Sequence, residues 1–323
     1  MKNKSLPPKV LLTGASGYLG SHIARSLEQC GWTVGILVRP NGGRRTRPFS
    51  KHEEVFFYTG TYESIHKCLL TFRPSVVIHL ASLFLVRHEA KDIEDLVGSN
   101  ILFGTQLLEA MSDVGVKFIV NAGTSWQHYQ SATYDPVNLY AATKQAFEDI
   151  LLYYTEARGI ESATLKLFDT YGPEDARPKL LNLLLQTLRT GETLDMSPGN
   201  QIVDFTHVQD VVCAFKLAAE GLMNGTIASS SSFAIRGGTP VTLRELVSMI
   251  ERISGERLQV QFGALPYRSR EVMKLWDGEI LRGWVPVVSL EDGLRQLLAN
   301  NKMSADKNII KKLDSSANEN DCP

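Results

Sequence analysis

Two patterns of apolar and polar residues alternate along the first half of the chain. Short runs rich in Val, Ile and Leu are typical of strands buried on both faces of a sheet, and segments with apolar residues every three or four positions are typical of helices. The predicted strands are 10–13, 33–38, 54–58, 75–79, 117–121 and 163–168, and the predicted helices are 21–30, 62–72, 88–113 and 140–158. This order predicts an α/β fold with a doubly wound parallel sheet of the Rossmann type.

The alternation changes after residue 169. Helices are predicted at 179–190, 208–222 and 241–253, and the serine tract 229–232 is interpreted as a loop. We therefore predict a dinucleotide-binding Rossmann domain over residues 1–169 and a smaller C-terminal α/β substrate-binding lobe over 170–301. Some segments of this lobe are expected to return to the sheet. Residues 302–323 are polar and are predicted to form a disordered tail.

Composition and charge exclude several classes of protein. Hydrophobic residues make up 43% of the chain and charged residues 21%, which is typical of a globular protein. The formal net charge of −1 gives no reason to expect nucleic acid or an anionic membrane as a partner. The four cysteines are far apart and no histidines have metal-site spacing, so no metal is expected. Without a signal peptide or an apolar span, a cytoplasmic protein is expected.

A glycine-rich turn follows the first predicted strand directly. Its sequence, TGASGYLG at 13–20, opens the first predicted helix. Glycines are needed where the backbone turns tightly and approaches a pyrophosphate, and the helix N-terminus offers free N–H groups to that anion. The turn therefore predicts a dinucleotide site formed by Gly14, Ser16, Gly17, Tyr18, Leu19 and Gly20.

The end of the second predicted strand indicates which dinucleotide is bound. An enzyme specific for NAD usually has an acidic residue there, whereas this chain has Arg39, followed by Arg44, Arg45 and Arg47. Guanidinium groups at this point can pair with a 2′-phosphate. NADP(H) is therefore the favoured cofactor, with NAD(H) as the alternative.

The predicted helix after the fifth strand begins with a catalytic pattern. Tyr140 and Lys144 are four residues apart, so both side chains can point into one cleft. A neighbouring ammonium is expected to lower the pKa of the tyrosine toward a useful range. Thr124 and Ser125 follow the fifth strand, and either hydroxyl could bind a carbonyl oxygen, with Thr124 as the first choice.

Taken together, these motifs resemble the extended short-chain dehydrogenase/reductases, the NAD-dependent epimerase/dehydratase family, which act mostly on nucleotide-diphosphate sugars. The resemblance extends to about residue 295 and includes HLAS at 79–82, Asn100, YGP at 171–173 and DFTHV at 204–208. It implies that Lys144 also binds the nicotinamide ribose. It further implies that the cofactor pocket includes Leu80, Ala81, Ser82 and Asn100.

Two longer strings, 123–129 and 166–173, are similar to CDP-abequose and CDP-paratose synthases, the 4-ketoreductases of dideoxyhexose biosynthesis for lipopolysaccharide O-antigens. The chain departs from the family at Asp169, where Asn is usual, and at Val203, where Arg is usual. A carboxylate beside a diphosphate is unfavourable, so Asp169 is expected to contact another group, and Arg268 or Arg270 to hold the diphosphate. The implied substrate-binding residues are Trp126, Gln127, His128, Asp169, Arg268 and Arg270.

The leading hypothesis is NADPH-dependent reduction of the 4-keto group of a nucleotide-diphospho-dideoxyhexose, with Tyr140 as general acid. A 4-epimerase with tightly bound NAD is the alternative, because it would use the same residues. A dehydratase is less favoured, and a non-catalytic NADP-sensing regulator on the same fold is a third class. The expected partners are a nucleotide-diphosphate sugar and a second copy of the chain in a homodimer.

Overall fold

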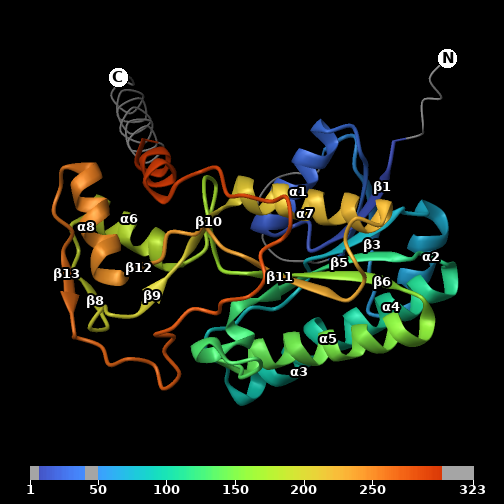
Figure 1. The fold of residues 1–323 in the computed structure, drawn as a ribbon, viewed down its shortest axis with the longest axis horizontal. Helices are drawn as coiled ribbons and strands as arrows, with labels where there is room; N and C mark the ends of the chain where they lie inside the picture. The colour runs from blue at the N-terminus through green and yellow to red at the C-terminus, as the bar shows by residue number, and fades with distance from the viewer. Residues whose placement is uncertain (1–6, 41–49, 300–323) are drawn as a thin grey trace, which may run out of the picture.

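A parallel sheet of seven strands lies at the centre of the protein (Figure 1). The computed structural model describes residues 7–40 and 50–299, so Arg44, Arg45, Arg47 and the tail predicted at 302–323 lie outside the described residues. Every neighbouring pair in the sheet is parallel. The spatial order is β11 (Ser231–Ile235), β6 (Glu161–Leu167), β5 (Phe118–Thr124), β4 (Val76–His79), β1 (Lys9–Thr13), β2 (Thr33–Val38) and β3 (Glu54–Phe57).

Helices cover both faces of this sheet. Helices α1 (Tyr18–Gln29) and α7 (Val208–Asn224) pack on one face, and α2 (Tyr62–Phe72), α4 (Phe103–Val114) and α5 (Leu139–Arg158) pack on the other (Figure 1). The central strands are buried on both sides, which explains why they are continuous runs of Val, Ile and Leu rather than alternating patterns. The predicted doubly wound parallel sheet is therefore confirmed.

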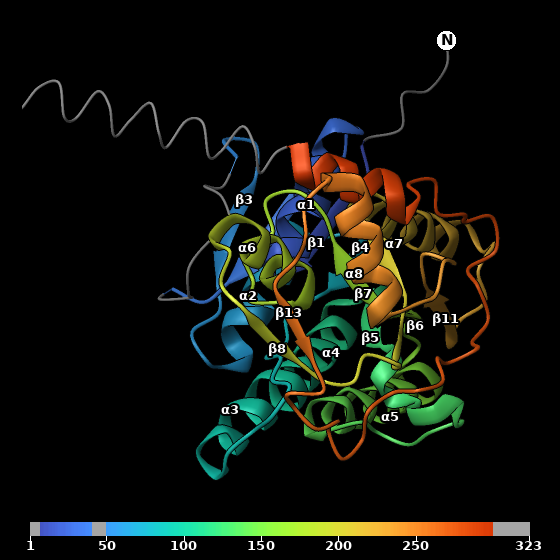
Figure 2. The same cartoon turned by 90° about the vertical axis from the view of Figure 1, so that its left-hand side faces the viewer.

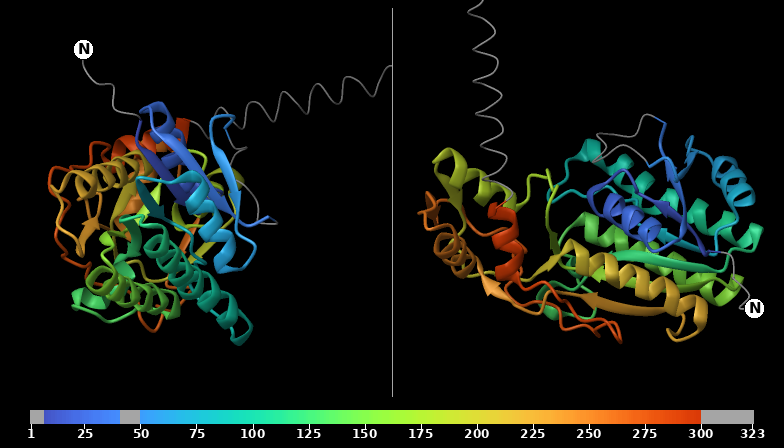
Figure 3. Two further views of the ribbon diagram at one scale, coloured as in Figure 1. Left: turned by 90° about the vertical axis from the view of Figure 1, so that its right-hand side faces the viewer. Right: turned by 90° about the horizontal axis from the view of Figure 1, so that it is seen from above.

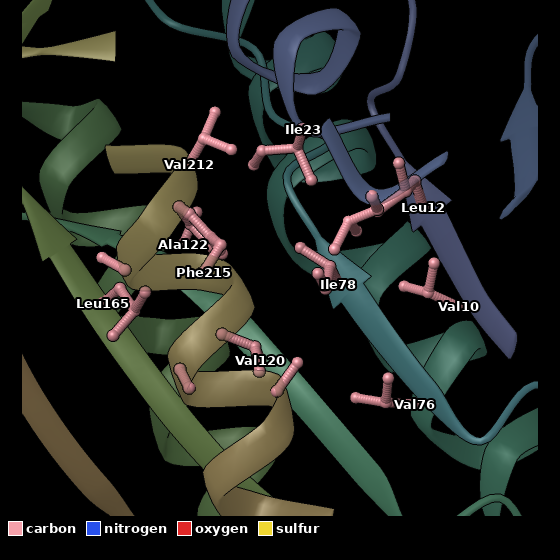
Figure 4. Packing of buried hydrophobic residues seen from close by; sticks show 14 of the residues in the cluster. Val10, Leu12, Ile23, Val76, Ile78, Val120, Ala122, Leu165, Val212 and Phe215 are labelled. Carbon is pink, nitrogen blue, oxygen red and sulfur yellow. The ribbon is translucent and has the colours of Figure 1, made fainter. Parts of the chain in front are cut away.

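The close-up in Figure 4 shows how one of these faces is filled. Leu12 of β1, Ile78 of β4 and Val120 of β5 point toward Ile23 of α1 and Phe215 of α7. All five side chains are at most 1% exposed. Complete burial of such a side chain contributes about 1.5–3 kcal/mol to folding, so this layer holds α1 and α7 firmly on the sheet.

A smaller lobe lies beside the sheet, as the views in Figures 2 and 3 show. It contains α6 (Leu180–Thr190), α8 (Leu243–Ser254) and a helical segment at 290–299, which share a separate apolar core. Three short strand pairs complete it: β7 (Asp169–Tyr171) with β10 (Phe205–His207), β9 (Ile202–Val203) with β12 (Val241–Thr242), and β8 (Leu194–Met196) with β13 (Val260–Phe262).

Three differences from the sequence-based expectations concern the main sheet and the helices that cover it. The serine tract is not wholly a loop, because β11 begins at Ser231 and pairs with β6 as the edge strand. Strand β5 continues three residues further than expected, to Thr124, because its pairing with β6 extends to Leu167. The helix expected at 88–113 is interrupted between α3 (Ile93–Val97) and α4 by a π-helical turn at Gly98–Leu102, a rare form that hydrophobic periodicity does not reveal.

The packing in Figure 4 predicts a large effect of truncating Phe215. Phe215→Ala should lower the free energy of unfolding by about 3–5 kcal/mol, because it leaves a cavity between α7 and the sheet. Phe57→Ala is the matched control, since Phe57 is 50% exposed on β3. Urea denaturation measures both values, and equal losses would contradict this packing of Phe215.

Candidate active site

Three adjoining cavities lie where the strands of the sheet end. The loop cavity, of 540 Å³, is lined by the glycine-rich turn and by Arg39. The central cavity, of 310 Å³, contains Tyr140 and Lys144. The lobe cavity, of 730 Å³, lies between the sheet and the smaller lobe. Gly14 and Ser82 line both the loop and the central cavities, and Phe84 and Lys179 line both the central and the lobe cavities, so the three form one continuous site.

The glycine-rich turn leaves space that any side chain would fill. Gly14 has a φ of +73°, and a Cβ there would lie 2.7 Å from the backbone nitrogen of Ala81. At Gly20 a Cβ would lie 2.3 Å from the carbonyl oxygen of Gly14, where α1 crosses the turn. Helix α1 begins at Tyr18 without a side-chain cap, so its first amides can bond an anion. This backbone cradle fits the pyrophosphate of a dinucleotide.

The predicted cofactor residues around this turn lie together. Ser16, Arg39 and Ala81 line the loop cavity, and Tyr18, Leu19 and Gly20 line the central cavity. Gly14, Gly17, Leu80 and Ser82 line both. Arg39 is exposed immediately after β2, and two carboxylates, Glu94 and Asp95, line the same loop cavity.

Tyr140 and Lys144 come from the first turns of α5. The side chain of Asn138 caps this helix by accepting a hydrogen bond from the Ala141 amide at 3.0 Å. Both side chains line the central cavity, and Lys144 is only 2% exposed. Burial lowers the pKa of Lys144 to about 8, against the opposing effect of the Glu148 carboxylate.

The pKa expected for Tyr140 is not found. Burial raises the pKa of Tyr140 to about 12, and the Ser82 hydroxyl offsets this only in part. The expectation of a lowered value considered the lysine alone, whereas removal of the phenolate from water has the larger effect. Tyr140 is therefore protonated at neutral pH, which is the form of a proton donor.

Two hydroxyls at the end of β5 also face the central cavity. Thr124 is its last residue, and its Oγ1 accepts a hydrogen bond from the Trp126 amide at 3.3 Å. Ser125 lines both the central and the lobe cavities. The structure thus places both candidate hydroxyls on the cavity that contains Tyr140.

Asn100 does not line any of the three cavities. It is 2% exposed, on the π-helical turn. Its Oδ1 accepts from the Leu83 amide at 2.7 Å, and its Nδ2 donates to Thr143 Oγ1 at 2.9 Å. Asn100 therefore ties the segment after β4 to helix α5, and its contact with the cofactor stays a prediction.

Gln127 is likewise fully buried and away from the cavities. Its Oε1 accepts from the Thr124 amide at 3.0 Å, and its Nε2 donates to Gln145 and Glu148 at 2.8 and 2.9 Å. The amide is bonded entirely within the protein, so Gln127 shapes the end of β5. It does not line the three cavities, and its contact with the substrate stays a prediction.

Aromatic side chains form a wall of the site. The Trp126 and Phe84 rings lie 5.7 Å apart, and Phe84 meets Tyr140 edge-on at 5.0 Å. The His128 ring stacks on Trp276 at 4.0 Å, with 7° between the two planes. Trp126 and His128 line the lobe cavity as expected from the sequence. Phe84 and Trp276 were missed, because neither belongs to a local motif.

Several charged side chains at or near the site form ion pairs of unequal tightness. Asp169 Oδ1 lies 4.0 Å from Lys179 Nζ, which agrees with the expectation that this carboxylate contacts another group. Arg268 lines the lobe cavity and binds Glu271, with 2.6 Å between Nη2 and Oε1. Arg270 pairs with Asp135 and does not line the three cavities. Lys179 was missed by the sequence analysis, and only its place soon after the YGP motif could have indicated it.

Two negative findings apply to residues 7–40 and 50–299. They contain no group of three or more His, Cys, Asp or Glu side chains placed to hold a metal ion. None of their helices is both long enough and apolar enough to cross a membrane.

Comparison with known proteins places the chain in a family. Residues 10–228 match the NAD dependent epimerase/dehydratase family. The chain belongs to this family. CDP-abequose synthase from Salmonella muenchen is 24% identical over 297 residues, which cover 90% of this chain and 97% of the relative. UDP-glucuronate 4-epimerase from Thermodesulfobacterium geofontis is 25% identical over 315 residues, covering 88% and 94%.

A solved structure shares the same architecture over most of its length. MoeE5 in complex with UDP-glucose and NAD superposes with a TM-score of 0.78 at 28% identity, covering 92% of this chain and 99% of that one. The family expected from the sequence is thus confirmed. The chain is a nicotinamide-dependent enzyme of this family that modifies nucleotide sugars.

The cradle at Gly14 predicts that this glycine is essential for cofactor binding. Gly14→Ala should weaken the binding of NADPH or NAD by about ten- to hundredfold, because the left-handed backbone and the contact with Ala81 each oppose a Cβ. Gly31→Ala is the control: φ is +83° there, and no atom lies within 4 Å of the new Cβ. Fluorescence titration gives both constants. An unchanged affinity of Gly14→Ala would contradict this assignment.

Proposed function

We propose that this enzyme reduces the 4-keto group of a CDP-4-keto-3,6-dideoxyhexose with NADPH. The observation that carries the proposal is the place of Tyr140 in the central cavity, which Lys144, Thr124, Ser125 and the glycine-rich turn also line, with Phe84 edge-on to its ring. An enzyme that reduces a carbonyl needs an acid to protonate the carbonyl oxygen, and the hydroxyl of Tyr140 can donate that proton.

The residues of the central cavity divide the chemistry among them. NADPH supplies the hydride when it is bound on the glycine-rich turn. Tyr140 donates its proton to the carbonyl oxygen as that oxygen becomes negative, and the Lys144 ammonium stabilises the resulting phenolate. Thr124 or Ser125 donates a hydrogen bond to the same oxygen. The tyrosine then regains its proton from solvent through the open cavity.

The aromatic wall supports a deoxygenated sugar as substrate. Phe84 meets Tyr140 edge-on, and Trp126 packs beside Phe84, so ring carbons lie next to the position of the reacting carbonyl. A sugar hydroxyl against such a surface would lose its hydrogen bonds to water without replacement. A 3,6-dideoxyhexose places methylene and methyl groups there instead. The similarity to CDP-abequose synthase agrees with this choice of sugar and base.

Lys179 and Arg268 are the best-placed cations for the substrate diphosphate. Lys179 lines both the central and the lobe cavities, and its carboxylate partner, at 4.0 Å, is beyond hydrogen-bonding distance. Arg268 lines the lobe cavity and is oriented by Glu271. A diphosphate between Lys179 and Arg268 would bind these cations more strongly than the single carboxylate beside each one, because the diphosphate carries two negative charges.

A 4-epimerase is the second candidate. UDP-glucuronate 4-epimerase from T. geofontis is as similar to this chain as CDP-abequose synthase is, at 25% against 24% identity. Epimerisation oxidises and re-reduces one carbon, so it needs the same tyrosine and lysine. It differs in returning its cofactor to the starting state in each turnover.

Cofactor consumption distinguishes the two functions. We expect the purified protein to carry little bound NAD and to oxidise one NADPH for each CDP-4-keto-3,6-dideoxyhexose converted. The loss of absorbance of the reduced nicotinamide measures this oxidation. Tightly bound NAD, together with interconversion of 4-hydroxy epimers without added cofactor, would reject the reductase and favour the epimerase.

Tyr140→Phe should lower turnover by roughly 10²–10⁴, the usual effect of losing a general acid. The affinity for NADPH should change little, because the ring stays in place. Tyr134→Phe is the control, since Tyr134 is 49% exposed and does not line the central cavity. Turnover of Tyr140→Phe within a few-fold of the parent would remove Tyr140 from the mechanism.

Arg39 should determine the preference for NADPH. Arg39→Ala is expected to lower kcat/KM for NADPH far more than for NADH, because a charge-assisted contact with the 2′-phosphate is lost. Arg73→Ala, on the turn after α2, should change neither value. Steady-state kinetics with both cofactors provide the comparison. Equal losses with NADPH and NADH would show that Arg39 has a structural role only.

A further inference from the structure

A buried ion pair lies beneath the central cavity, between β6 and α5. Lys166 of β6 is 5% exposed, and its Nζ lies 3.2 Å from Glu148 Oε2. The same ammonium lies 2.9 Å from His128 Nε2. A side chain at position 123 would not fit, because a Cβ on Gly123 would lie 2.9 Å from both Glu148 Oε1 and Lys166 Cγ.

The histidine beside this pair is neutral. Its Nε2 faces the Lys166 ammonium and accepts a hydrogen bond from it, so the ring proton is on Nδ1, which donates to the Ala132 carbonyl at 3.1 Å. Burial and the nearby Lys166 lower the pKa of His128 to about 4. Trp276 stacks on the ring and adds no charge. The carboxylate that compensates Lys166 is therefore Glu148.

Glu148 also connects to two parts of the catalytic centre. Its Oε1 accepts a hydrogen bond from Gln127 Nε2 at 2.9 Å, and Gln127 Oε1 accepts from the Thr124 amide at 3.0 Å. Glu148 lies one turn after Lys144 on the same face of α5, and its negative charge raises the pKa of that lysine against the effect of burial.

We propose that Glu148 is a positioning residue of this enzyme, which fixes the strand end at Thr124 through Gln127 and keeps the buried Lys144 ammonium charged. Lys166 holds the carboxylate in place for both tasks. The inference rests on the proposed function only in assigning Lys144 a role as an ammonium. Buried ion pairs add little net stability, so the main effect of this one is on its neighbours.

The other titratable groups facing Lys144 do not supply this charge. Tyr140, on the same helix, stays neutral at neutral pH because burial raises its pKa to about 12. His79 of β4 also faces Lys144, and burial together with that ammonium lowers the pKa of His79 to about 3. Neither group therefore offers a negative charge to the Lys144 ammonium near neutral pH, and the carboxylate that faces this lysine is that of Glu148.

The test measures the titration of Lys144 without substrate or cofactor. The amine reacts with acetic anhydride only as the free base, so the pH dependence of its acetylation, followed by peptide mass spectrometry, gives its midpoint. In Glu148→Gln the midpoint should fall by roughly one pH unit, as expected for removal of a neighbouring opposite charge. Glu156→Gln, an exposed change on the same helix, should leave the midpoint unchanged.

A second variant controls for a possible loss of folding in Glu148→Gln. Glu148→Gln leaves Lys166 buried without a carboxylate, so the double variant Glu148→Gln/Lys166→Met is measured beside it, with circular dichroism as the check of folding. It should show the same lowered midpoint. A parental midpoint in the folded variants would overturn the proposal. The readout needs no turnover, so absence of reductase activity would count against the proposed function and leave this result intact.

Gln127→Leu separates the two tasks of Glu148. It breaks the link to Thr124 but leaves the carboxylate, so the Lys144 midpoint should stay parental while turnover with NADPH and the 4-keto sugar is lost in part. Parental turnover in Gln127→Leu would limit the role of Glu148 to the charge of Lys144.

Discussion

Hydrogen bonds between parallel strands hold the carboxyl ends of β1, β4, β5 and β6 at one edge of the sheet, and the site is assembled there. Thr13, at the end of β1, is paired in register with His79, at the end of β4, and Thr13 Oγ1 lies 2.8 Å from His79 Nδ1. The same hydroxyl accepts hydrogen bonds from the Leu80 and Ala81 amides at 3.2 Å. This brings the backbone after β1 and the backbone after β4 so close that Gly14 must lack a side chain. The cradle for a pyrophosphate is thus a consequence of strand pairing.

Burial then determines the charges that this edge can carry. It keeps Tyr140 protonated and lowers the pKa of Lys144 to about 8, so both groups titrate away from their ordinary ranges. Two lysines of this region lie beside carboxylates, Lys166 beside Glu148 and Lys179 near Asp169. The tight pair is buried below the cavity, and the loose one lines it. This difference suits Lys166 to a fixed role and Lys179 to an exchangeable one in the proposed reaction.

The sequence predicted what local patterns encode. Strand-forming runs, the glycine-rich turn and the spacing of Tyr140 and Lys144 each depend on neighbouring residues, and the predicted parallel sheet was confirmed. Edge strand β11 was missed, since two of its first residues are serines that favour loops. Phe84, Lys179 and Trp276 reach the site from separate parts of the chain, so only the tertiary fold brings them together. Asn100 and Gln127 stand in family motifs, but their amides hold the backbone, a distinction that sequence alone does not make.

The proposed reductase and its epimerase alternative need the same acid at the same carbon, so Tyr140 and Lys144 cannot separate them. The difference lies in what must move. An epimerase holds its cofactor and must present both faces of the keto sugar to it. The sugar therefore has to rotate inside the site. A reductase fixes one face and exchanges the cofactor. Phe84 packs against Tyr140 and Trp126 packs against Phe84, so aromatic rings lie beside the acid, whereas Arg39 is exposed and lines the loop cavity. The proposed reductase follows if these rings hold the sugar in one orientation while the cofactor exchanges past Arg39.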